Sequence, residues 1–168
     1  MPTTLKTPRL TLRKHCEADF PAFAAFFMHP LSSRHSIIRY PNLDFCRAVF
    51  NDRLTQEHAW VCVLTETGEA IGDIYLSGIT AKYLAEIGCI LSPEHWGHGY
   101  MTEAMNAVLD HAFNDMYLGR VRAVAMQSNA QSISMLERCG FVREATLNEW
   151  AYGGFIVDVY YYSLIKPI

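Results

Sequence analysis

The stretch of residues 91–104 combines glycines, polar residues and an expected helix start in a pattern suited to binding an anion. Gly97 and Gly99 form a Gly-x-Gly loop between an expected strand and an expected amphipathic helix. Glycine permits backbone conformations that other residues avoid, and it lets a ligand approach the backbone closely. The free N–H groups at a helix start, together with the helix dipole, favour negative charge. Spacing alone leaves two interpretations open, a cradle for a pyrophosphate and an ordinary strand–helix turn.

Two common phosphate-binding motifs do not fit this loop. A dinucleotide fingerprint requires a place in the first strand–helix unit and a third glycine, where this chain has Thr102. A triphosphate-binding loop requires Gly-Lys-Ser/Thr, a sequence that the chain lacks. His95 and His98 form an HxxH pair, but the pair lies beside the glycines in a loop rather than on a helix face. No metal site is therefore expected.

The composition indicates a folded, soluble protein. Of the 168 residues, 51% are hydrophobic and 18% are charged, with a net charge of −3, which excludes a disordered chain. Acidic residues outnumber basic ones by 17 to 14, so nucleic acid is not an expected partner. No apolar run approaches the roughly 20 residues of a membrane span, and the first residues lack a signal-peptide core. We expect a cytoplasmic protein without a membrane partner, whose five cysteines are buried free thiols.

The elements that position the loop follow from hydrophobic periodicity. Alternation and short apolar runs predict strands at 9–13, 60–64, 70–77, 84–91, 120–126 and 158–165. Helical spacing predicts helices from about 17, 44, 101 and 129, the last ended by Gly140, whereas residues 30–41 are expected to be irregular. We therefore expect a single domain over residues 1–168. Its fold would be α/β, with a mixed, mostly antiparallel sheet of about six to seven strands and helices on both faces.

Six short segments follow one another in a recognisable order: 7–13 with Asp19, 70–72, 85–88, 96–104, 129–132 with Gly140 and Phe141, and 154–158. In this order they resemble the motifs of the GNAT superfamily of acetyl-CoA-dependent N-acetyltransferases. The resemblance is greatest to the branch whose members acetylate the N-terminal alanine of ribosomal proteins, and it covers nearly the whole chain. It implies that acetyl-CoA is a co-substrate and that the sheet is splayed at the strands that bind it.

The resemblance also implies which residues bind the co-substrate. The backbone of Cys89, Ile90 and Leu91 would contact the pantetheine arm, which lies in the splayed gap like an additional strand. Asn129 would lie near the arm across the gap. Glu94 stands where the family often has Gln or Arg, and it is expected to point to solvent because an acid would repel a phosphate. The pyrophosphate would be held by the amides of Gly97, His98, Gly99, Tyr100, Met101 and Thr102.

Three residues are the main candidates for proton transfer, and Tyr152, in the same segment as Glu149, is a further candidate for the acid. By the resemblance, Ser132 corresponds to the acid and Glu149 to the base of the ribosomal-alanine branch, since the tyrosine of many other members is replaced here by Leu136. Glu86, on the strand that leads to the co-substrate, is the rival base. Other interpretations stay open: Ser132 as a residue of a helix cap, Glu149 as a solvated acid in a loop, and Glu86 as the partner of a basic residue on a neighbouring strand.

The implied function is the transfer of an acetyl group from acetyl-CoA to a primary amine by direct attack in a ternary complex. The amine would belong to a protein N-terminus or to a small molecule. It would be read by segments 28–40 and 149–155 and by the first two helices, which are rich in aromatic, histidine and arginine residues. The alternative is a catalytically weak or inactive domain that binds an acyl-CoA and acts as a regulator. The sequence leaves open whether the protein is a homodimer.

Overall fold

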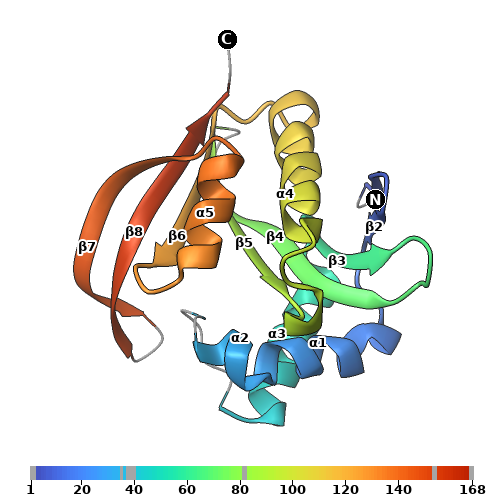
Figure 1. The fold of residues 1–168 in the computed structure, drawn as a ribbon. Helices are drawn as coiled ribbons and strands as arrows, with labels where there is room; N and C mark the ends of the chain where they lie inside the picture. The colour runs from blue at the N-terminus through green and yellow to red at the C-terminus, as the bar shows by residue number, and fades with distance from the viewer. Residues whose placement is uncertain (1–2, 35, 37–40, 81–82, 153–154, 167–168) are drawn as a thin grey trace.

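A computed structural model of the chain describes residues 3–34, 36, 41–80, 83–152 and 155–166 (Figure 1). These residues form one eight-stranded sheet with the order β1-β2-β3-β4-β5-β6-β8-β7. The strands are β1 (Leu5–Lys6), β2 (Leu10–Arg13), β3 (Ala59–Leu64), β4 (Ala70–Thr80), β5 (Leu84–Leu91), β6 (Arg120–Met126), β7 (Val142–Tyr152) and β8 (Phe155–Ile165). The helices are α1 (Phe20–Met28), α2 (Pro30–Arg34), α3 (Leu43–Thr55), α4 (Tyr100–Asp110) and α5 (Ala130–Arg138), with short 3-10 turns at Glu17–Asp19 and Pro93–His95 and a π turn at His111–Asp115.

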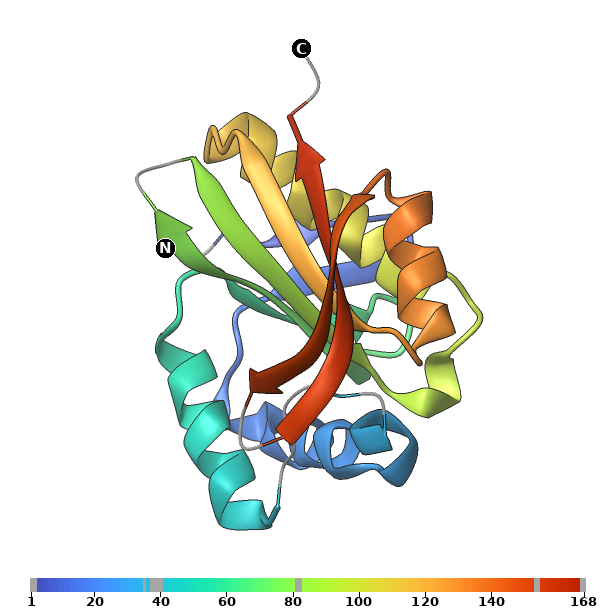
Figure 2. The same ribbon diagram turned by 90° about the vertical axis from the view of Figure 1, so that its left-hand side faces the viewer.

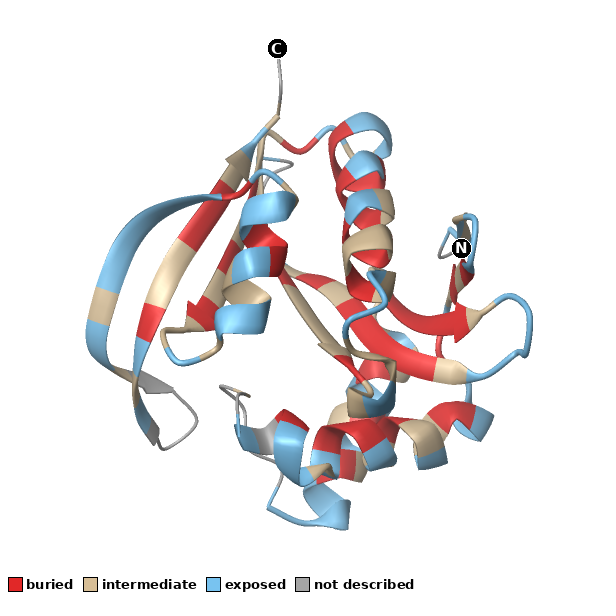
Figure 3. Ribbon diagram, viewed as in Figure 1, coloured by how far each residue is buried: buried red, intermediate tan, exposed pale blue. Residues whose placement is uncertain are grey.

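The expected α/β fold is confirmed, but the sheet has more strands than the six to seven expected. The two additional strands are β1, of two residues, and β7. β7 forms a long hairpin with β8 at the edge of the sheet (Figure 2), and most of its side chains are exposed (Figure 3). Such a strand has no buried face and therefore no apolar alternation to reveal it. The segment expected to be irregular also contains the short helix α2.

The strands are antiparallel to their neighbours except at one place, the parallel pair β5 and β6. That pairing is brief, because it runs only from Leu84 opposite Arg120 to Glu86 opposite Arg122. Beyond Glu86 the last five residues of β5 have no partner on β6, although they stay paired with β4. The sheet is thus splayed between β5 and β6, as expected.

Helices cover both faces of the sheet, which creates two apolar clusters. Met101, Ala104, Met105 and Val108 form a buried stripe at helical spacing on α4, and they pack with one face of the central strands. A second cluster centres on the phenylalanines of α1 and on α3, and Ile90 of β5 packs against it. Figure 1 shows α4 and α5 flanking the region where β5 and β6 separate, with α1–α3 on the other side of it.

The cysteines and the lengths of the helices were also subjects of expectation from the sequence. All five cysteines are free thiols, but Cys16 is exposed rather than buried, and Cys89 and Cys139 are partly buried. Within the described ranges, no helix is both long and apolar enough to cross a membrane.

Candidate active site

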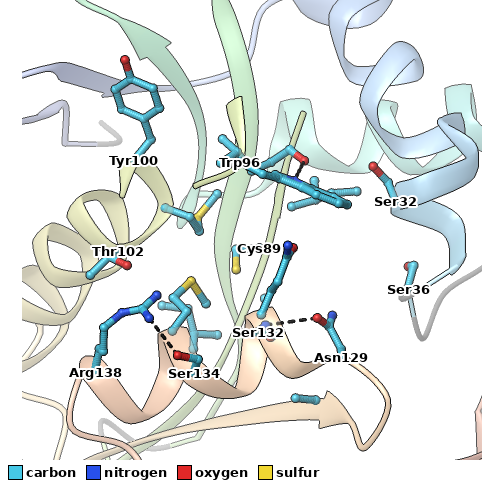
Figure 4. A pocket seen from close by; sticks show the side chains of 18 of the residues that line it. Ser32, Ser36, Cys89, Trp96, Tyr100, Thr102, Asn129, Ser132, Ser134 and Arg138 are labelled. Carbon is cyan, nitrogen blue, oxygen red and sulfur yellow. Dashed lines mark hydrogen bonds between the residues drawn. The ribbon is translucent and has the colours of Figure 1, made fainter. Parts of the chain in front are cut away.

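A cleft of about 1090 Å³ opens where β5 and β6 separate. One wall is the loop at residues 96–99 with the first turn of α4, and the opposite wall is the end of β6 with α5. Strand β5 forms the floor between them, and α1 and α2 close one end. Figure 4 shows this arrangement, with Cys89 of the floor between Thr102 of one wall and Ser132 of the other. The cleft is large enough for an extended cofactor that reaches from one end to the other.

The glycine loop has the geometry of an anion cradle. Gly97 and Gly99 have φ values of 81° and 78°, in the left-handed region that glycine adopts without strain. Within the described part of the chain, none of the N–H groups of residues 97–102 donates to an acceptor, whereas the N–H of Glu103 donates to the Gly99 carbonyl at 3.0 Å. Six consecutive amides are therefore available at a helix N-terminus, where the helix dipole also favours an anion.

The loop is held in place from both ends. The indole Nε1 of Trp96 donates to the Leu91 carbonyl at 2.9 Å, which ties the loop to the end of β5. From the other side, Arg9 Nη1 donates to the His98 carbonyl at 3.0 Å. The Arg9 guanidinium also lies 4.5 Å from the centre of the Tyr100 ring. These contacts fix the cradle before any ligand arrives, which reduces the ordering cost of binding.

Glu103 anchors Arg9. Its Oε2 accepts from Arg9 Nε at 2.7 Å, and its Oε1 accepts from Thr7 Oγ1 at 2.6 Å. Burial acts to raise the pKa of Glu103, but the hydrogen bonds from Thr7 and Arg9 outweigh it and bring the pKa below its usual value. Glu103 is therefore a structural carboxylate, because its charge is committed to holding β2 and the loop together.

The opposite wall begins at a capped helix. The side-chain oxygen of Asn129 accepts from the N–H of Ser132 at 3.1 Å, which caps α5. The cap is thus made by Asn129, and the Ser132 hydroxyl has no hydrogen-bond partner in the parts of the chain that the structure describes. Between the walls, burial raises the pKa of Cys89 to about 12. Its thiol stays protonated at neutral pH and is not a nucleophile.

The floor of the cleft on the side of α1–α3 carries a carboxylate and an aromatic ring. Glu86, Gly88 and Ile90 share this face of β5, and Tyr75 of β4 is the direct neighbour of Gly88. Phe27 of α1 and Trp150 of β7 also line this end of the cleft. This surface therefore combines apolar and aromatic side chains with one carboxylate and with the hydroxyl groups of Ser32 and Ser36.

Beside this floor, on the same face of the sheet, lies a buried polar cluster. Asp73 accepts from Arg53 Nε at 3.2 Å and is 2.7 Å from Nε2 of His15, and all three residues are buried. The guanidinium carbon of Arg53 lies 3.6 Å from the centre of the Tyr75 ring. The cluster therefore holds the Arg53 guanidinium, which is paired with Asp73, against the Tyr75 ring.

Most of the residues that the sequence suggested for the site line this one cleft: Glu86, Cys89, Ile90, Leu91, Gly97, Gly99, Tyr100, Met101, Thr102, Asn129 and Ser132. Met101 can contribute only its backbone, because its side chain is in the core. The Tyr100 ring points away from the cavity (Figure 4). His98 and Glu149 are not among the lining residues.

The segment around Glu149 is part of a strand rather than the expected loop. Glu149 lies within β7, at a register shift between Leu147 and Trp150, and its φ is 54°. Its N–H donates to Asp158 Oδ1 at 2.8 Å, and its side chain is exposed. The expected turn residues 153 and 154, like acceptor-reading residues 35 and 37–40, lie outside the described residues. Glu94 is exposed, as expected.

Several residues of the site were not found by sequence reasoning. Tyr75, Trp96 and Arg138 line the cleft, and Arg9 supports it from behind. Arg9 and Glu103 both lie in segments that carry the family resemblance, but their contact spans 94 positions. The Gly88 position did carry a signal, since a glycine inside a strand often marks a close approach by another group.

The comparisons with known proteins agree with this geometry. A family model described as "Acetyltransferase (GNAT) domain" matches residues 9–142. The chain is 31% identical over 172 residues to "Uncharacterized N-acetyltransferase p20" of Bacillus licheniformis, a match that covers 97% of this chain and 96% of that protein.

Solved structures share the fold. A GNAT-family acetyltransferase from Bacillus anthracis superposes with a TM-score of 0.89 at 23% identity, covering 97% of this chain and 98% of the other. The ribosomal-protein-S5-alanine acetyltransferase from Vibrio fischeri superposes with a TM-score of 0.81 at 24% identity, covering 97% and 96%. At these identities the likeness is one of fold.

Proposed function

The chain belongs to the GNAT family of acetyltransferases, and from this premise we propose that it acetylates a primary amine, at a protein N-terminus or in a small molecule. The reaction would be a direct attack of the amine on acetyl-CoA in a ternary complex. The observation that carries the proposal is the splayed gap between β5 and β6, which joins six free amides at one end to a carboxylate at the other. One cleft can thus hold both substrates, and proximity supplies much of the rate.

The co-substrate would lie along the wall that begins at the glycine loop. The amides of residues 97–102 would bind its pyrophosphate, as the N-terminus of a helix favours. The unpaired edge of β5 at Cys89, Ile90 and Leu91 would bind the pantetheine arm, which carries amide groups of its own. Asn129 and Ser132 would contact the arm from α5.

Glu86 is the base that we propose. It is the last residue of β5 that is paired with β6, and it lines the cleft on the face of Tyr75 and Gly88. The other carboxylate among the lining residues is Glu103, which Arg9 and Thr7 already engage. The position of Glu149, exposed and outside the lining, makes it the weaker candidate.

The experiment is thiol release from acetyl-CoA in the presence of a panel of peptides with free N-termini and of small primary amines, with mass spectrometry of each acceptor. We expect an acetylated amine and an equal yield of CoA. Binding of acetyl-CoA without thiol release for any acceptor would instead support an acyl-CoA-binding regulator.

Comparison of two conservative variants tests the base. Glu86→Gln and Glu149→Gln each keep the side-chain shape and remove the proton acceptor. At one pH and saturating acetyl-CoA, Glu86→Gln should lose at least tenfold in kcat, about 1.4 kcal/mol of barrier, and Glu149→Gln should lose little. The reverse result would return the role to Glu149. If neither variant is slower, the amine reaches the cleft already neutral and needs no protein base.

A further inference from the structure

The hydroxyl of Tyr75 lies against Gly88, and both residues line the cleft. The two residues are directly opposite each other on β4 and β5. A Cβ atom at position 88 would overlap the Tyr75 Cζ and hydroxyl oxygen and would lie 2.7 Å from Cε1. The phenol therefore lies across the backbone of β5, in the space that any other residue at position 88 would fill.

The direction and length of the gap determine which part of a bound co-substrate would lie beside the Tyr75 hydroxyl. The anion cradle follows the end of β5 at Leu91, and the gap closes at Glu86, where β5 pairs with Arg122 of β6. An arm that starts at the cradle and runs along the free edge of β5 must therefore end before Glu86. Its reactive end would lie near Gly88 and Cys89, beside the Tyr75 hydroxyl.

We propose that Tyr75 is the catalytic acid that gives its phenolic proton to the departing sulfur of CoA. The inference rests on the proposed acetylation of an amine. The usual family position for such a tyrosine holds Leu136, which is buried in the core at 2% exposure and cannot serve. A residue from a different strand would supply the same chemistry in this chain.

The amine nitrogen forms the new bond to the carbonyl carbon, and the electron pair of the C–S bond passes to sulfur. Sulfur takes the Tyr75 proton, so that CoA leaves as a thiol. The nitrogen gives its surplus proton to Glu86, and that proton returns to the Tyr75 oxygen through solvent, which restores both residues.

The buried cluster of Arg53, Asp73 and His15 suits Tyr75 to the role of an acid. The Arg53 guanidinium, 3.6 Å from the ring centre, stabilises the negative charge that develops on the phenol as it gives up its proton. Asp73 and His15 hold Arg53 in a buried network, so the Arg53 side chain stays against the ring rather than in solvent. Glu86 lies two residues before Gly88 on the same face of β5, about 7 Å away along the strand. The acid and the base thus reach the same reacting centre from one surface.

The first test is Tyr75→Phe, which keeps the ring and its contacts with Arg53 and Gly88. The control is Tyr83→Phe, since Tyr83 is 75% exposed and lies at the far end of the β4–β5 connection. We expect kcat of Tyr75→Phe to fall roughly 10²- to 10⁴-fold, with KM for acetyl-CoA unchanged, and Tyr83→Phe to match the wild type. An active wild-type enzyme with an equally fast Tyr75→Phe variant would overturn the inference and leave the proposed function intact.

The second test needs no turnover. The thiol of bound CoA is titrated by its ultraviolet thiolate absorbance, with the desulfo-CoA complex as the blank for the protein's own cysteines. If Tyr75 donates to this sulfur, the bound thiol should titrate about one pH unit lower in the wild type than in Tyr75→Phe. Equal titration in the two proteins would remove Tyr75 from the site, even if kcat differs.

A third variant covers the case in which Tyr75→Phe does not fold. Replacement of Tyr75 by 3-fluorotyrosine keeps the hydroxyl and makes it more acidic. If Tyr75 must be protonated for catalysis, the alkaline fall of kcat should move to lower pH in this protein. An alkaline limb that stays in place would contradict the assignment.

Discussion

Gly99→Val tests whether the glycine loop binds the co-substrate, because the structure separates its effect on folding from its effect on binding. Gly99 is the N-cap of α4, with φ 78° and ψ 5°. A Cβ atom there would meet only Arg9 Nη2, at 3.6 Å, so the free protein has space for the side chain. The cost to stability is then the left-handed backbone alone, about 1–2 kcal/mol, which lowers Tm by roughly 2–8 °C in a protein of this size.

The effect on binding should be larger. A valine side chain would stand among the amides of residues 97–102 and hinder the close approach of a pyrophosphate. Each hydrogen bond from an amide to a charged oxygen contributes about 1.5–3 kcal/mol. The loss of one such bond would raise the Kd for acetyl-CoA roughly 10- to 150-fold.

The chain offers a matched control for the backbone strain. Gly68, in the turn between β3 and β4, has φ 76°, and nothing lies within 4 Å of a Cβ atom built on it. Gly68→Val should therefore lose as much stability as Gly99→Val but keep the wild-type Kd. Calorimetry with acetyl-CoA and thermal melting of both variants make the comparison. A folded Gly99→Val protein with wild-type affinity, or an equal loss of affinity in both variants, would refute the assignment of the loop.

Two further predictions concern the walls of the cleft. Asn129→Ala should lower the free energy of unfolding by about 1 kcal/mol through loss of the α5 cap, which lowers Tm by roughly 2–4 °C. Asn129→Asp, the control, should retain most of the stability. An unchanged Tm in Asn129→Ala would show that the cap contributes nothing. Glu103→Gln should be less stable than the wild type by about 1 kcal/mol at neutral pH. Since the folded-state pKa of Glu103 is lowered, this difference is fully present above the unfolded-state pKa and should vanish as the pH falls through the folded-state value. Urea unfolding at a series of pH values measures it, and a difference that is constant with pH would contradict the role of the Glu103 charge.

The central elements could be predicted because their local patterns agree with their tertiary environment. β5 and β6 have the expected bounds, since each is rich in apolar residues and enclosed by clear breaks. α4 has a buried stripe at helical spacing, and Gly140, with φ 88°, follows the end of α5 as expected. These same elements carry the loop, the floor and the α5 wall. The cleft was therefore predictable in outline from short-range signals.

What the sequence did not reveal depends on long-range contacts. The contact between Arg9 and Glu103 joins β2 to α4, and Tyr75 reaches the site only because β4 pairs with β5 at Gly88. Neither contact leaves a periodic pattern. For Glu149, by contrast, a local motif suggested a role that its position in the fold does not favour. Its place in a motif suggested a base, but the register shift in β7 leaves its side chain exposed and outside the cleft lining.

The gap between β5 and β6 connects the stability of the fold to its activity. Where a strand edge has no neighbouring strand, its backbone N–H and C=O groups lack the hydrogen-bond partners that a sheet would supply. Here the unpaired stretch of β5 begins directly after Glu86 and leads towards the free amides of residues 97–102. A substrate with amide groups along its length and phosphates at one end would satisfy both sets of groups at once. The gap that leaves part of β5 unpaired would thus also be the feature that binds the co-substrate, and binding should stabilise the fold.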